Sequence, residues 1–168
     1  MRLRDTQHND LEAILALYKK VALVPGGLAH QEKELDEEYT KKILSNSLET
    51  GLSMVIVDRS DKVVAEVHAY PPGLFCFSHV LTELTIAVDS EYQGTGLGRR
   101  IFEAFMLRII DHHPEVNRVE LITRESNSRA INFYQTLGFS IEGKMHSRIK
   151  NTDGVLEADI PMAWIRFK

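Results

Sequence analysis

The residues with the clearest chemical use form a glycine-rich turn near the middle of the chain. Three glycines alternate there with single residues, in the order Gln-Gly-Thr-Gly-Leu-Gly-Arg from position 93. Because glycine has no Cβ, such a backbone lets a ligand approach closely. The pattern that follows predicts a helix, and the first amides of a helix lack intrahelical acceptors and attract anions. We therefore expect a phosphate or pyrophosphate site made of Gln93, Gly94, Thr95, Gly96, Leu97, Gly98 and Arg99.

Two runs with different periods must position this turn. Before it, the alternating, β-branched residues 84–88 predict a strand. After it, Leu97, Ile101 and Phe105 recur at i, i+4 and i+8 and predict a helix that ends near residue 112. The turn is thus expected to join the end of a strand to the start of a helix.

The same two periods recur along the rest of the chain. Helices are expected after a cap at Asn9 or Asp10, over residues 35–48, and after a cap at Ser126 or Asn127. Strands are expected at residues 1–6, 52–57, 63–70, 75–88, 118–123, 139–149 and 155–165. This order predicts one α/β (α+β) domain covering residues 1–168, in which helices flank a mixed sheet.

The charge and length of the chain limit the partners that we expect. The formal net charge of −4 argues against a nucleic-acid binder with a broad basic face. No apolar run approaches the length of a membrane span. The N-terminus shows no signal-peptide core, and a single cysteine, Cys76, excludes an intrachain disulfide. We expect a cytoplasmic protein without a nucleic-acid or membrane partner.

Two common phosphate-binding motifs do not fit the glycine turn. A mononucleotide P-loop carries Lys and Ser or Thr after its last glycine, whereas Arg99, Arg100 and Ile101 follow here. A dinucleotide fingerprint needs Gly-x-Gly-x-x-Gly. Counted from Gly94 or Gly96, its third glycine is replaced by Arg99 or Ile101. Both motifs are therefore disfavoured.

The turn resembles instead the Gln/Arg-x-x-Gly-x-Gly motif of the GNAT superfamily of acyl-CoA N-acyltransferases. Residues 126–139, Ser-Asn-Ser-Arg-Ala-Ile-Asn-Phe-Tyr-Gln-Thr-Leu-Gly-Phe, resemble the second signature of that family. There an asparagine opens a helix that ends in Tyr-x-x-x-Gly-Phe. The resemblance covers residues 83–139, and the stretch 141–163 is similar to members that acetylate free amino acids or other small amines.

This resemblance implies the GNAT fold, with a mixed, mostly antiparallel, twisted sheet of about six to seven strands and about four helices. It implies an N-acetyltransferase that uses acetyl-CoA, without a metal, and a small-molecule amine as partner. In the family, a backbone N–H of the strand before the turn binds the reacting carbonyl oxygen, which maps to Ile86, Ala87 and Val88. The resemblance also implies that Asn127 contacts the coenzyme while it caps its helix.

Two side chains are candidates for proton transfer. Tyr134 matches the family position whose hydroxyl protonates the leaving sulfur, and the alternative is a core tyrosine on an apolar helix stripe. Strand parity predicts that Leu84, Ile86 and Val88 form an apolar face and that Glu83 lies on the opposite face. Glu83 is therefore the candidate base, with a solvated carboxylate at a strand end as the alternative. His68 and His79 are interpreted as ordinary sheet residues.

Other functions stay open. Family members that acetylate ribosomal-protein N-termini carry a glutamate five residues before the capping asparagine, where this chain has Ile122. A protein N-terminal or lysine acetyltransferase is thus a rival hypothesis, and an acyl-CoA sensor without turnover is another. Direct attack by the amine is favoured because Cys76 lies outside both motifs. Exposed C-terminal strands can also pair with a second copy, so a homodimer is a further hypothesis.

Overall fold

The computed structural model describes residues 1–24, 27–151 and 153–166. The chain divides into two compact units. The first unit consists of Met1–Tyr70 and Thr85–His113, and the second of Pro71–Leu84 and Pro114–Lys168. That residues 1–168 form a single domain stays a prediction.

The strands of the first unit follow the order β1-β2-β3-β4. They are β1 (Arg2–Asp5), β2 (Leu52–Val57), β3 (Val63–Tyr70) and the last part of β4 (Val80–Val88). β2 pairs antiparallel with both β1 and β3. Every residue of β2 is buried, as expected for a strand that is covered on both faces.

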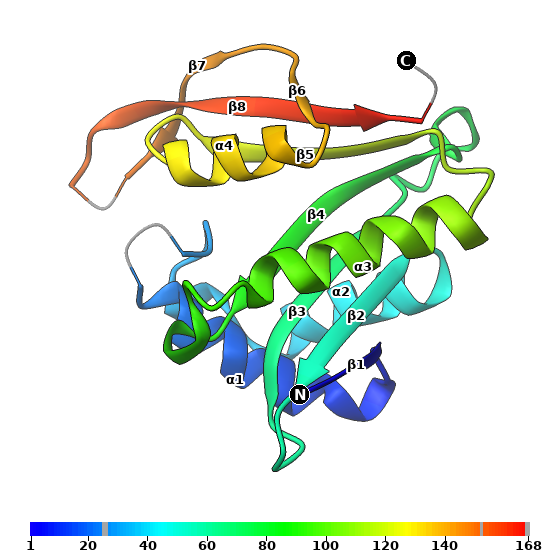
Figure 1. The fold of residues 1–168 in the computed structure, drawn as a ribbon. Coiled ribbons are helices and arrows are strands. Elements are labelled where there is room, and N and C mark those ends of the chain that lie inside the picture. Colours follow the sequence, from blue (N-terminus) through cyan, green and yellow to red (C-terminus); the bar gives the residue numbers. More distant parts are fainter. Residues whose placement is uncertain (25–26, 152, 167–168) are drawn as a thin grey trace. The chain divides into compact units, whose positions relative to one another are not determined.

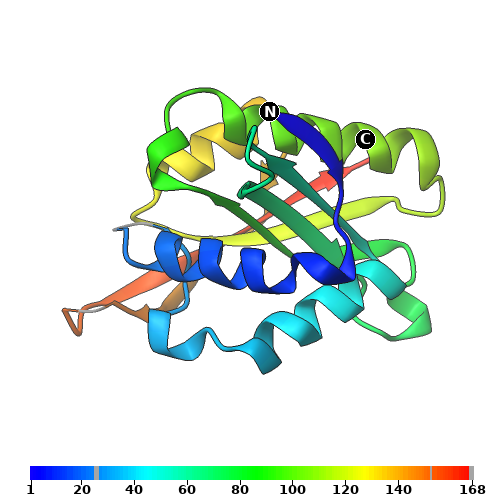
Figure 2. The ribbon, with the colours of Figure 1, turned by 90° about the horizontal axis from the view of Figure 1, so that it is seen from below.

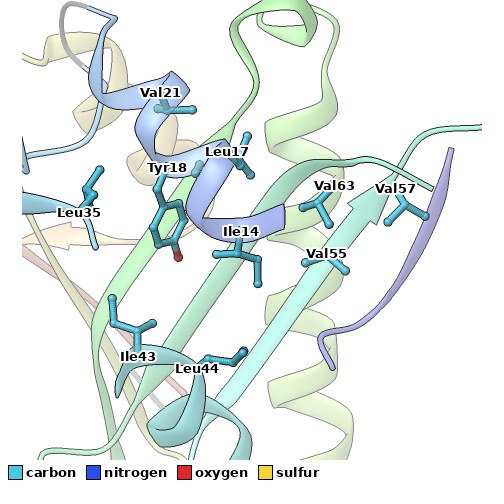
Figure 3. Packing of buried hydrophobic residues seen from close by; sticks show 11 residues of the cluster. Ile14, Leu17, Tyr18, Val21, Leu35, Ile43, Leu44, Val55, Val57 and Val63 are labelled. Carbon is cyan, nitrogen blue, oxygen red and sulfur yellow. The ribbon is translucent and has the colours of Figure 1, made fainter. Parts of the chain in front are cut away.

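Three helices cover the strands of the first unit. α1 (Leu11–Ala22) and α2 (Glu37–Glu49) lie side by side on one face, and α3 (Leu97–His112) lies on the other (Figure 2). The α2 helix begins at Asp36, whose carboxylate accepts a hydrogen bond from the Tyr39 amide at 2.7 Å. Between α1, α2 and the strands lies an apolar core (Figure 3), made of Ile14, Leu17, Tyr18, Val21, Leu35, Ile43, Leu44, Val55, Val57, Val63 and Ala87.

The second unit contains the first part of β4 and the C-terminal elements (Figure 1). They are β5 (Arg118–Arg124), α4 (Ser128–Thr136), β6 (Ser140–Ile141), β7 (Met145–Lys150) and β8 (Leu156–Ile165). The strand order is β4-β5-β8-β6, and β7 also pairs with β8. The β4–β5 pair is parallel, and β8 pairs antiparallel with β5, β6 and β7.

The architecture confirms the predicted fold class, a mixed and mostly antiparallel α/β fold. The described residues hold four α-helices and eight strands, more strands than predicted. The predicted strand 139–149 is wrong in one respect, because residues 142–144 leave the ladder and divide it into β6 and β7. The predicted strand 75–88 begins only at Val80, after a short 3-10 helix at Phe75–Phe77. Within the described ranges, no helix has the length and apolar character needed to cross a membrane.

Candidate functional site

The glycine turn of the first unit has a backbone that only glycine adopts easily. Gly94 and Gly96 have φ angles of +77° and +84°. A Cβ built on either residue would meet no atom within 4 Å. Both glycines are therefore required by the left-handed backbone, and the space beside them is open for a ligand. By contrast, a Cβ on Gly98 would lie 3.5 Å from Val88 Cγ2, an ordinary contact.

Side chains within the turn fix its shape. The side-chain amide of Gln93 donates a hydrogen bond through Nε2 to the Val88 carbonyl oxygen at 3.4 Å, which connects the turn to the end of β4. The Thr95 hydroxyl donates to the Tyr92 carbonyl oxygen at 2.6 Å. The Arg100 amide donates to the Gly96 carbonyl oxygen at 3.0 Å, the first hydrogen bond of α3. The turn thus presents the start of a sixteen-residue helix, as the sequence predicts.

A buried carboxylate at the start of the turn region holds it in place. Asp89, which follows β4 directly, has a side chain only 1% exposed and accepts hydrogen bonds from Lys20 Nζ at 2.6 Å and Lys62 Nζ at 3.2 Å. It also accepts from the Glu91 amide at 3.1 Å. Burial by itself raises the pKa of Asp89, but these donors outweigh burial and lower the pKa below its ordinary value. Sequence reasoning missed this anchor because Lys20 lies on α1, far away in the chain.

The strand before the turn departs from the predicted parity. Glu83 has a φ of +54°, a left-handed conformation in the middle of β4, and its side chain is exposed. Ala87 is fully buried, whereas Ile86 and Val88 are partly exposed. Leu84 is buried but Ile86 and Val88 are only partly buried, so the predicted apolar face of these three residues stays a prediction. The left-handed Glu83 interrupts the alternation, so the face of Glu83 itself cannot be derived from the parity of the residues that follow it.

The second unit holds the other predicted site residues. Asn127 caps α4, and its Oδ1 accepts a hydrogen bond from the Ala130 amide at 3.1 Å, which confirms the predicted cap. Tyr134 is buried on the same helix, and its ring packs against Phe133 and Phe139. Burial raises the pKa of the Tyr134 hydroxyl. This hydroxyl therefore keeps its proton at neutral pH, the form that a general acid needs.

The structure brings the predicted residues together in two groups. The first unit holds the turn, residues 93–99, with Ile86, Ala87 and Val88, and the second unit holds Glu83, Asn127 and Tyr134. Arg99 pairs with Glu103 at 3.1 Å on the surface of α3. No cluster of three or more potential metal ligands lies among the described residues.

Comparison with known proteins relates the chain to one family. The model of the acetyltransferase (GNAT) family matches residues 11–139. Spermine/spermidine N(1)-acetyltransferase of Bacillus subtilis (strain 168) is 33% identical over 58 residues, which make up 34% of this chain and 38% of that protein. The chain therefore spans well under half the length of this curated relative.

Solved structures show the same fold over the whole chain. A GNAT superfamily phosphinothricin acetyltransferase from Sinorhizobium meliloti, in complex with AcCoA, has a TM-score of 0.84 at 19% identity. The match covers 98% of this chain and 87% of that one. The ribosomal-protein-S18-alanine N-acetyltransferase from Escherichia coli has a TM-score of 0.76 at 26% identity, covering 98% of this chain and 92% of that one.

Proposed function

Because the chain belongs to the acetyltransferase (GNAT) family, and is thus an N-acetyltransferase that uses acetyl-CoA, we propose that its acceptor is a small primary amine. The observation that carries the donor side is the open turn at Gly94 and Gly96, anchored through Asp89. The acceptor side is supported by the curated relative, whose name gives spermine and spermidine as substrates.

The turn fits a pyrophosphate. An added Cβ at Gly94 or Gly96 would fill open space, so an anion can approach the backbone there. In our proposal the coenzyme pyrophosphate binds to residues 93–99, with Arg99 adding positive charge. The backbone of Ile86, Ala87 and Val88 binds the pantetheine arm and the carbonyl oxygen of the thioester, and Asn127 adds a contact to the coenzyme.

The chemistry asks for two proton transfers. The amine nitrogen attacks the thioester carbon, a C–N bond forms and the C–S bond breaks. An alkylammonium has a pKa of about 10, so a base must first free its lone pair. Either Glu83 or a chain of water molecules takes this proton. Tyr134 gives its proton to the departing thiolate; because burial raises the pKa of its hydroxyl, the hydroxyl is protonated at neutral pH. The single thiol, Cys76, lies in neither motif, which supports direct attack.

A rival acceptor is the α-amine of a protein. The likeness to the Escherichia coli ribosomal-protein-alanine enzyme favours this alternative. Against it stands Ile122 on β5, where members with that substrate carry a glutamate. Ile122 is half exposed and has no proton-accepting group.

A thiol-release assay with acetyl-CoA tests the proposal. The candidate acceptors are spermidine, phosphinothricin, free amino acids and a peptide that begins with alanine. We expect release with at least one small amine and little with the peptide. If only the peptide causes thiol release, the proposal of a small-amine acceptor is wrong and the acceptor is a protein amine. If the protein binds acetyl-CoA tightly but no amine causes thiol release, the result favours the acyl-CoA sensor over the enzyme. Tyr134→Phe is the matched control, because it keeps the ring and removes the proton.

A further inference from the structure

A buried carboxylate and a buried histidine lie two residues apart on β3. Glu66 and His68 are each 1% exposed. Their neighbours along the strand, Ala65, Val67 and Ala69, are fully buried and apolar. Such a place is unfavourable for a charged group unless hydrogen bonds surround it. The pair therefore requires a physical explanation that the fold alone does not supply.

Hydrogen bonds surround the Glu66 carboxylate. The Tyr18 hydroxyl of α1 donates to Oε2 at 2.7 Å, and the Ser53 hydroxyl of β2 donates to Oε1 at 2.9 Å. His68 Nδ1 lies 3.1 Å from Oε1 and 3.3 Å from Oε2. Figure 3 shows the Tyr18 hydroxyl pointing away from α1. Both carboxylate oxygens are thus acceptors, as in an ionised carboxylate.

These contacts determine which nitrogen of His68 carries hydrogen. Nδ1 lies against the two Glu66 oxygens and, at 3.0 Å, the Tyr18 oxygen. None of these can donate to it, because the single proton of Tyr18 is used for Glu66. Burial, followed by the charge of Glu66, raises the pKa of Tyr18 well above its usual value, so Tyr18 keeps that proton. Nδ1 is therefore the N–H, and the lone pair of the neutral ring lies on Nε2.

A carboxylate bonded to one ring nitrogen orients the ring and stabilises an added proton on the other. The Ser53 hydroxyl also lies 2.7 Å from the Thr6 hydroxyl, and aromatic side chains continue the cluster. Tyr70 of β3 stacks on the His68 ring at 6.1 Å between centroids, and the Tyr39 ring of α2 lies 4.7 Å from the His30 ring with a tilt of 50° between the planes. Tyr39 and Tyr70 both contribute to raising the pKa of Tyr18, so both lie near it. Tyr39, Tyr70 and His30 are partly exposed, which extends the polar cluster from the buried carboxylate toward the surface of the first unit.

We propose that His68 is the proton acceptor of the reaction, a role that rests on the proposed function. In this proposal, a chain of water molecules carries to Nε2 the proton that the acceptor ammonium loses. The N–H bond at the amine breaks, an N–H bond forms at Nε2, and Glu66 balances the charge of the imidazolium. After the acetylated product dissociates, His68 releases this proton to solvent. This assigns the base role to the water chain and His68 in place of Glu83.

His68→Asn is the sharpest test. An asparagine amide nitrogen lies as many bonds from Cα as Nδ1 does, so the variant still donates to Glu66 but lacks the base. We expect unchanged acetyl-CoA affinity by calorimetry. With acetyl-CoA and spermidine as first probe, kcat at neutral pH should fall by about 10²–10⁴-fold. The deficit should shrink about tenfold per pH unit toward the pKa of the amine, because more amine is then already neutral.

Ser47→Ala provides the control for a lost buried hydrogen bond. Ser47 is buried in α2, and its hydroxyl donates a hydrogen bond to the Ile43 carbonyl oxygen at 2.8 Å. This variant should keep the wild-type rate and pH profile. If His68→Asn loses the same fraction of activity at every pH, or none, the proposal is wrong.

A second variant keeps the test decisive if His68→Asn does not fold. Glu66→Gln removes the charge that balances the imidazolium and keeps a similar shape. The acidic side of its kcat/KM profile should move to lower pH, and an unmoved profile would contradict the proposal. Failure of the proposed function is a separate result, since wild-type protein would then release no thiol with any amine.

Discussion

Replacing Gly96 tests the cofactor turn most directly. Gly96 has a φ of +84°, and a Cβ there would meet no atom within 4 Å. Gly96→Asp and Gly96→Asn add side chains of almost equal size. Asp and Asn are also the non-glycine residues that best tolerate a left-handed backbone. The two variants therefore differ mainly by one negative charge beside the proposed pyrophosphate.

The structure sets the size of both effects. A non-glycine residue in the left-handed conformation costs about 1–2 kcal/mol. Both variants should therefore lose a similar amount of unfolding free energy. The added charge, about 4 Å from a phosphate charge, costs about 1 kcal/mol in water and about 4 kcal/mol at an effective dielectric constant of 20. The Asp variant should thus bind acetyl-CoA more weakly than the Asn variant, by about fivefold to several hundredfold.

Calorimetric titration with acetyl-CoA at two salt concentrations measures this difference. We expect the gap between Asp and Asn to narrow at high salt, because salt screens exposed charges. Gly73→Asp is the matched control, since Gly73 also has a φ of +84° and no atom within 4 Å of an added Cβ. Equal affinities of the two Gly96 variants, or an equal loss in Gly73→Asp, would refute a pyrophosphate site at this turn.

Three further variants address single residues. Tyr134→Phe should lower kcat by about 10²-fold or more with little change in acetyl-CoA affinity, and an equal loss of both in kinetics and calorimetry would remove its role as acid. Glu83→Gln should keep the shape of the wild-type pH–rate profile, whereas a loss greatest at low pH would make Glu83 the base. Asp89→Asn should lose about 2 kcal/mol of unfolding free energy at pH 7 in urea titrations. Because the folded-state pKa of Asp89 is depressed, this deficit should vanish as pH falls through that pKa, and a constant deficit would contradict the anchor.

Elements with a clean period were predicted almost to the residue. β2 and β3 have the predicted bounds, and α3 runs to His112 as its apolar spacing indicates. The Asn127 cap was predicted from local sequence, since a cap bonds only to an amide three residues away. The family assigned from the glycine turn and the Asn127–Tyr134 helix is confirmed by the match over residues 11–139.

Partners that are distant in the chain could not be predicted. The Lys20–Asp89 contact joins α1 to the residue after β4, the Tyr18–Glu66 contact joins α1 to β3, and no spacing rule connects those positions. His68 was interpreted as an ordinary sheet residue because nothing in the sequence places a hydroxyl and a carboxylate around its ring. One signal was present, since Glu66 and His68 are two ionisable residues at i, i+2 in an otherwise apolar strand.

Glu83 shows how one backbone angle changes the interpretation of a strand. The prediction for β4 assumed regular alternation, which no sequence feature contradicted, because glutamate gives no warning of a positive φ. A left-handed glutamate costs about 1–2 kcal/mol, so the surrounding structure must hold it. Irregular residues within strands free neighbouring backbone groups from the ladder and redirect side chains. An N–H freed in this way is what the proposed binding of the thioester oxygen requires at Ile86–Val88. The left-handed Glu83 thus marks β4 as irregular just before the segment to which this backbone role is assigned.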